Sequence, residues 1–171
     1  MHFSRLTTLK LVNRVDKLQL SKVDEKLLLA RAKYNKLMNS FVLRIDKVTL
    51  QVFLVTRKAM CFSHSVDVAA ALLPYGIRIK ESTLCTSTWV AKLDVHQLNL
   101  YQFFSFLVKH YNTFYMYFEP ELFHCITVKH NKITLRIFHS GKVVLLGVKR
   151  VCELVESWKF ICNAFEKYTL V

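Results

Sequence analysis

The chain has 171 residues, of which 53% are hydrophobic, while only 3 are glycine and 2 are proline. This length can enclose a sizeable core, and the composition excludes a long disordered linker. The formal net charge of +13 at pH 7 favours a polyanionic partner, because lysine and arginine contacts to phosphate release counterions. The alternative is that surface lysines only keep the chain soluble.

Several classes of protein are disfavoured by the same sequence. Apolar runs stay far below the roughly 18 residues of a spanning helix, and residues 1–5 lack a signal-peptide core, so we expect a soluble intracellular protein with no membrane partner. The 5 cysteines form no Cys-x-x-Cys pair, and we expect them to be small core residues. Ser140-Gly141-Lys142 lacks the upstream glycines of a phosphate loop, and the histidines show no ligand spacing. We therefore expect no enzyme, no metal and no cofactor.

In chain order, the first half predicts a strand, a helix, three strands and a short helix. The first helix is expected to begin at Ser21-x-x-Asp24, a variant of the capping box. The expected strands are 6–15, 38–45, 49–55 and 59–63, and the short helix is 66–73, ending at Pro74-Tyr75-Gly76.

The second half predicts the same order of elements. The expected strands are 82–93, 123–128, 134–138 and 143–146, and the expected helices are 98–110 and 149–168. The last helix carries an apolar stripe at three-and-four spacing, which favours packing on a sheet over partner binding. Its members are Val151, Leu154, Val155, Trp158, Ile161, Cys162 and Phe165.

One eight-residue pattern occurs twice, at Asp46 to Phe53 and at Asn131 to Phe138, starting points that lie 85 residues apart. Apolar residues alternate with threonine, a long polar residue and phenylalanine in both copies, which is typical of a strand with one buried face. We interpret the chain as one domain made by internal duplication, with repeat 1 at 1–77 and repeat 2 at 78–171. A ligand would then meet the second face twice, and duplex DNA is a two-fold ligand.

Two stretches of the second half resemble the TATA-binding protein family. They are Phe118-Glu119-Pro120-Glu121-Leu122-Phe123 and the run from Ile137 through Ser140-Gly141-Lys142 to Lys149. The first half is similar more faintly, through 30–35, Arg44-Ile45 and Val52-Phe53. The resemblance implies an α+β saddle, in which two pseudo-symmetric repeats form one curved antiparallel sheet with helices on the convex face.

The concave face of that saddle would sit on the minor groove of DNA. TATA-binding protein is itself an example of kinking by apolar wedges inserted between base steps. The resemblance maps wedges onto Met38, Phe53, Phe123 and Phe138, and phosphate contacts onto Arg44, Lys129, Arg57 and Lys142. The groove floor includes Val144 and Leu146.

The floor also departs from the family pattern. Gln51 and Arg136 stand where the family has leucine, and the two central asparagines of the family fall near Thr7 and Leu84. The remaining floor positions of the first repeat are Ala59 and Cys61, or Met60 and Phe62 if the turn at 55–58 carries one extra residue. Gln and Arg can bond to groove acceptors, and Gln can also accept from the guanine amine, so the base preference stays open.

The resemblance implies a general transcription initiation factor that binds and bends double-stranded promoter DNA. It would recruit a transcription-factor-IIB-like protein through Glu119, Glu121 and Leu122, and with it the RNA polymerase machinery. The corresponding residues of the first half, Asn35, Lys36 and Leu37, give less evidence of a factor-IIA-like partner. A scaffold or antagonist that has lost specific DNA binding is the alternative function. The expected location is the nucleus, or a cytoplasmic viral factory if the protein is viral.

Overall fold

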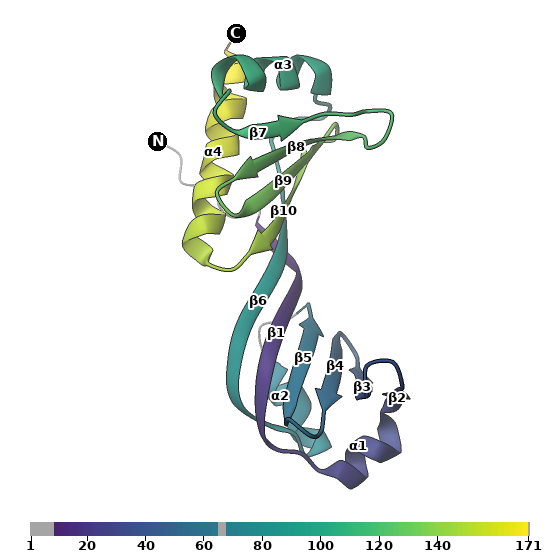
Figure 1. The fold of residues 1–171 in the computed structure, drawn as a ribbon. Coiled ribbons are helices and arrows are strands. Elements are labelled where there is room, and N and C mark those ends of the chain that lie inside the picture. Colours follow the sequence, from purple (N-terminus) through teal and green to yellow (C-terminus); the bar gives the residue numbers. More distant parts are fainter. Residues whose placement is uncertain (1–8, 65–67, 171) are drawn as a thin grey trace. The chain divides into compact units, whose positions relative to one another are not determined.

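The structure, a computed structural model, describes residues 9–64 and 68–170. The chain divides into two compact units, Leu11–Ser87 and a second unit that begins at Thr88. Each unit combines antiparallel strands with two α-helices (Figure 1).

The first unit contains four complete strands, two α-helices, all of β1 except its first residue, and the start of a sixth strand. In chain order these are β1 (Lys10–Lys22), α1 (Glu25–Arg31), β2 (Lys33–Asn35), β3 (Ser40–Ile45), β4 (Val48–Phe53), β5 (Lys58–Ser63), α2 (Val68–Leu72), a 3-10 turn (Leu73–Tyr75) and β6 (Arg78–Lys92). Because β6 runs to Lys92, its last residues belong to the second unit.

The second unit repeats this series. After β6 come α3 (Leu100–His110), β7 (Tyr115–Tyr117), β8 (Cys125–His130), β9 (Ile133–Phe138), β10 (Lys142–Val148) and α4 (Val151–Thr169). The order of hydrogen-bonded strands is β2-β3-β4-β5-β1-β6-β10-β9-β8-β7. The strands β1 to β5 of the first repeat correspond to β6 to β10 of the second. The order read from one edge therefore matches the order read from the other edge, as expected for an internal duplication.

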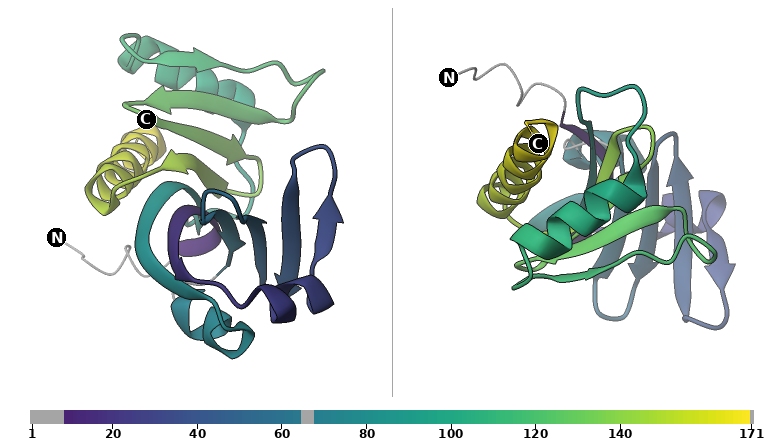
Figure 2. Two further views of the ribbon diagram at one scale, coloured as in Figure 1. Left: turned by 60° about the horizontal axis from the view of Figure 1, so that its bottom comes forward. Right: turned by 90° about the horizontal axis from the view of Figure 1, so that it is seen from above.

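Alternation along the strands explains where the two cores form. In β9, Ile133, Leu135 and Ile137 are almost completely buried, while the residues between them are only partly buried. The buried side chains pack with α3 and α4, which cover the same face of β8–β10 (Figures 1 and 2). Burial of one such side chain contributes about 1.5–3 kcal/mol. The helices therefore cover one face of the sheet and leave the other uncovered.

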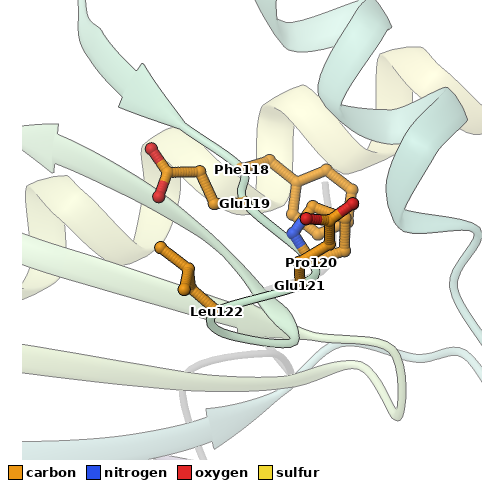
Figure 3. A pocket seen from close by; sticks show the side chains of 5 residues that line it. All are labelled: Phe118, Glu119, Pro120, Glu121 and Leu122. Carbon is orange, nitrogen blue, oxygen red and sulfur yellow. The ribbon is translucent and has the colours of Figure 1, made fainter.

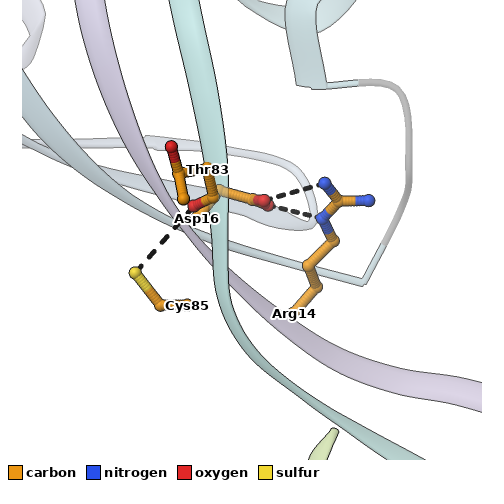
Figure 4. Close-up of polar contacts among 4 residues, drawn as sticks. All are labelled: Arg14, Asp16, Thr83 and Cys85. Carbon is orange, nitrogen blue, oxygen red and sulfur yellow. Dashed lines mark hydrogen bonds and ion pairs between the residues drawn. The ribbon is translucent and has the colours of Figure 1, made fainter. Parts of the chain in front are cut away.

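The first unit follows the same rule, with α1 and α2 packed against the buried residues of β3, β4 and β5. It also buries a charged pair, since Asp16 is 1% exposed. Arg14 donates two hydrogen bonds to its carboxylate, from Nε at 2.6 Å and from Nη2 at 2.8 Å (Figure 4). Two charge-assisted hydrogen bonds of this kind offset the free energy lost when the carboxylate and the guanidinium give up hydration.

Several local predictions need correction. Ser21 does not cap the first helix, because it still lies in β1 and its hydroxyl donates to the Arg78 carbonyl at 3.2 Å. The cap is Asp24, whose side chain accepts from the Leu27 amide at 3.1 Å. The short edge strands β2 and β7 were not predicted. The stripe of the last helix is buried at Leu154, but Val151 is 70% exposed.

Burial also separates the cysteines. Cys61 is a core residue as expected, and burial raises the pKa of its thiol to about 11. Cys125 is also buried, but it pairs with Phe138 on the side of the sheet away from the helices. Cys152 is exposed, contrary to the expectation.

The expected helix at 66–73 is observed as α2 and the 3-10 turn, and its residues 66–67 lie outside the described ranges. No described helix is long and apolar enough to cross a membrane.

Candidate nucleic-acid interface

Each unit has a sheet face that its own helices leave uncovered, and we call it the open face. On β4 the open face carries Thr49, Gln51 and Phe53, all partly buried, and on β9 it carries Thr134, Arg136 and Phe138. The side chains between them point into the two cores. The duplicated sequence pattern thus places the same three residue types on the open face of each repeat.

The expected wedge residues lie together at the end of this face. In the second repeat, Phe138 pairs with Cys125 on the open face of β8 and β9. Phe123 lies in the loop just before β8, and its ring is 5.0 Å from the guanidinium of Arg136, which belongs to the same face. Phe123 is 49% exposed, and Met38, its counterpart before β3, is 54% exposed. Large apolar side chains with this much exposure are available for contact with a ligand.

Basic residues lie on the same faces, toward the opposite end of the strands from Phe53 and Phe138. Arg44 pairs with Thr49 across β3 and β4, and Lys129 pairs with Thr134 across β8 and β9. Both side chains are exposed. Lys129 also places its Nζ 5.0 Å from the centre of the Tyr115 ring, a cation–π contact. The sequence prediction that Arg44 and Lys129 are equivalent agrees with their positions in the sheet.

The hairpin after β4 changes the alignment of the two repeats. The turn from β4 to β5 spans 54–57, one residue more than the turn 139–141 from β9 to β10. Lys58 therefore pairs with Phe53 and occupies the position of Lys142. Arg57 instead matches Gly141, and both have positive φ, 49° and 76°. The predicted equivalence of Arg57 and Lys142 needs correction by one residue.

The same extra residue decides which side chains of β5 lie on the open face. Gln51 pairs with Met60 and Thr49 pairs with Phe62, so Met60 and Phe62 share the open face with β4. Ala59 and Cys61 are 1% and 0% exposed and belong to the core. Of the two alternatives for the floor of the first repeat, the structure selects Met60 and Phe62.

The floor of the second repeat is apolar on one side of Arg136. Val144 pairs with Arg136, and Leu146 pairs with Thr134, both partly buried. On the other side, Arg136 pairs with Thr127, which is 3% exposed. The guanidinium group of Arg136 lies 5.0 Å from the centre of the Phe123 ring.

The two residues expected at the centre of the face have different outcomes. Thr7 lies outside the described residues. Leu84 lies in β6 and is partly buried. The Leu20 amide donates to the Arg57 carbonyl as the Leu93 amide donates to the Gly141 carbonyl, which equates Leu20 with Leu93. By this register the counterpart of Leu84 is Leu11.

The predicted partner residues form the loop between β7 and β8, which we call the second-repeat loop (residues 118–124). Its turn is closed by hydrogen bonds from the Leu122 and Phe123 amides to the Glu119 carbonyl, at 3.0 and 2.8 Å. Glu119 and Glu121 are exposed, and Leu122 is 79% exposed. In Figure 3 the carboxylates of Glu119 and Glu121 lie on opposite sides of the loop. The loop thus exposes two acidic side chains and one apolar side chain.

Two exposed tyrosines of the open face escaped the sequence analysis. Tyr115 pairs with Lys129 and Tyr117 pairs with Thr127, while Met116 between them packs against the core. Alternation of aromatic and apolar residues was the available signal, but three residues are too few to distinguish a strand from a loop. Within the described ranges, no cluster of His, Cys, Asp and Glu could hold a metal ion.

A sheet whose strand order is symmetric between two repeats, with helices on one face of each repeat, defines the class of two-repeat, TATA-binding-protein-like folds. A solved structure with this fold is Methanococcus jannaschii TBP, which matches with a TM-score of 0.71 and 22% sequence identity over 94% of this chain and 99% of that chain. Residues 87–168 match the sequence model of the family described as "Transcription factor TFIID (or TATA-binding protein, TBP)". None of the curated proteins matches the sequence.

The second repeat is similar in sequence to the TATA-binding protein family over residues 87–168, and the chain has the fold of a TATA-binding protein over nearly its whole length. The predicted α+β fold with two pseudo-symmetric repeats is therefore confirmed.

Proposed function

We propose that this protein is a transcription initiation factor that binds promoter DNA in the minor groove and bends it. One observation carries the proposal: both repeats place a phenylalanine, a second wedge residue and a basic side chain on the face that their helices leave open. In the second repeat these are Phe138, Phe123 and Lys129. A formal net charge of +13 supports a polyanionic ligand.

The wedges act by unstacking the outer base steps of the bound segment. Unstacking costs a few kcal/mol per step, and the bent duplex compensates by contacting more protein surface. Phe123 is half exposed already and needs little rearrangement to reach a base step. Met38 is a softer, less planar wedge than phenylalanine, so the kink at the first repeat is the weaker one.

Basic side chains hold the phosphates beside each kink. Arg44, Lys58, Lys129 and Lys142 lie on the open faces or at their edge, and all four are exposed. Arg57 lies in the adjoining turn. Each phosphate contact makes the slope of log affinity against log salt steeper by about 0.9, so the number of contacts can be measured.

The second-repeat loop recruits a factor-IIB-like protein and, with it, the polymerase. Glu119 and Glu121 are acidic residues on a basic protein, and their charges complement a basic partner surface. Leu122 supplies an apolar contact in the same loop, since it is 79% exposed. Acidic residues at this place do not assist DNA binding, which separates the two activities.

A scaffold or antagonist without specific DNA binding is the second candidate function. One observation favours it, namely that the guanidinium of Arg136 lies over the Phe123 ring. If this contact persisted in the presence of DNA, Phe123 could not enter a base step. The protein would then keep the partner loop but not the kink.

Selection from a random duplex library, followed by sequencing, tests the proposal. We expect an enriched motif and tight binding that weakens steeply with salt. Lys142→Ala should reduce the salt slope by about 0.9, because it removes one phosphate contact. Lys159→Ala is the matched control, since this exposed lysine lies on α4. The absence of any enriched duplex, or equal effects of the two variants, would support the scaffold.

A further inference from the structure

The two polar residues of the groove floor are in different hydrogen-bonding states. In the first repeat, the Gln51 Nε2 donates to the Ser40 hydroxyl at 2.9 Å. In the second repeat, the buried Nε of Arg136 has no acceptor among the residues that the structure describes. Cys125 occupies the place of Ser40 beside Phe138, so the second repeat lacks the hydroxyl that holds Gln51.

The unpaired Nε of Arg136 makes an acceptor from a ligand favourable. A buried donor without a partner has lost its water without compensation, and a ligand atom that accepts from it recovers that loss. The neighbours of Arg136 across the strands, Thr127 and Val144, leave the open face as the direction from which a ligand arrives. In the minor groove, purine N3 and pyrimidine O2 are the acceptors.

Arginine discriminates between base pairs because it only donates. Its five N–H groups suit the acceptors of an A·T pair, but the guanine amine of a G·C pair is also a donor and opposes them. Arg136 is also close to a wedge, since its guanidinium lies 5.0 Å from the Phe123 ring centre. The base pair it meets is therefore next to the kink.

Gln51 has the opposite character. Its amide nitrogen is engaged by Ser40, and its amide oxygen has no donor among the described residues. An oxygen in this position can accept from the guanine amine, the one feature that separates G·C from A·T in the minor groove. The first repeat therefore has an acceptor where the second repeat has a donor.

We propose that the two repeats read different base pairs: Arg136 requires A·T beside the second-repeat kink, and Gln51 selects a G·C pair beside the first-repeat kink. The proposal rests on the proposed function, since both residues act on a duplex in the minor groove. It makes the preferred site asymmetric and gives the protein one orientation on DNA.

The test is selection from a random duplex library with exchanged residues. The wild-type motif should contain one half limited to A·T and one half with a G·C pair. Arg136→Gln should raise the relative affinity for G·C over A·T in the A·T half by about tenfold. Gln51→Arg should lower the relative affinity for G·C in the other half by about tenfold. Arg44→Leu is the matched control, because the loss of a phosphate contact weakens all duplexes alike.

The outcomes separate this proposal from the proposed function. A motif whose halves have equal preference, or exchanges that leave both halves unchanged while binding persists, would overturn the proposal and leave DNA binding intact. Failure to enrich any duplex with wild-type protein would overturn both. Because Gln51→Arg lies in the other repeat, it tests the proposal independently if Arg136→Gln does not fold, which thermal unfolding reports.

Discussion

Replacement of Phe123 by alanine tests whether this residue is a DNA wedge or a core residue. Phe123 is 49% exposed, so about half of the 1.5–3 kcal/mol for full burial of such a side chain is at stake. Its contact with the Arg136 guanidinium adds about 0.5–1 kcal/mol at an exposed site. We therefore expect Phe123→Ala to lower the free energy of unfolding by about 1.3–2.5 kcal/mol.

The matched control is Ile126→Ala, three residues further along in β8. Ile126 is 0% exposed in the core of the second repeat, and its truncation should cost about 2–5 kcal/mol because a cavity remains. Urea denaturation measures both values. Fluorescence energy transfer between dyes on the two ends of the duplex should show reduced bending for Phe123→Ala and full bending for folded Ile126→Ala. A larger stability loss for Phe123→Ala than for the control, with bending unchanged, would refute the reasoning.

Three further predictions concern other parts of the chain. Lys58→Ala should reduce the salt slope of DNA binding by about 0.9, as expected for a counterpart of Lys142. Arg57→Ala should reduce this slope less, and a larger effect of Arg57→Ala would show that the phosphate contact is made by Arg57 in the turn. Glu119→Arg with Glu121→Arg should abolish docking of a factor-IIB-like protein and leave DNA binding equal or stronger, whereas loss of DNA binding alone would place the two glutamates on the wrong surface. Burial lowers the pKa of His130, so the unfolded chain binds more protons between that pKa and about 6.5. The free energy of unfolding should consequently fall as pH drops below about 6.5, and less so in His130→Gln; parallel pH profiles in urea denaturation would contradict this.

The strands with one buried face could be predicted from the sequence, because apolar and polar residues alternate along them. The repeated Thr-Leu-Gln-Val-Phe type of pattern identified β4 and β9, their buried faces and the duplication, because strand periodicity is a local property of the chain. The six-residue string at 118–123 and the Ser-Gly-Lys turn located the second-repeat loop and hairpin, and the fold class followed from them.

The pairing of residues between neighbouring strands could not be predicted from the sequence. The extra residue in the turn 54–57 cannot be detected without knowing which residues pair, and it moves the Lys142 counterpart from Arg57 to Lys58. The cap at Asp24 was missed because β1 extends to Lys22, beyond the expected strand end. The different hydrogen bonding of Gln51 and Arg136 depends on Ser40, a residue of a neighbouring strand that sequence reasoning had no cause to consider.

The bend angle of a selected duplex measures the central claim most directly. Wild-type protein should bring the labelled ends of the duplex together, and Phe123→Ala with Phe138→Ala should keep salt-dependent binding but leave the duplex straight, because only the wedges unstack base steps. Equal bending by the wild-type protein and the double variant, or a straight duplex bound to the wild-type protein, would contradict the account.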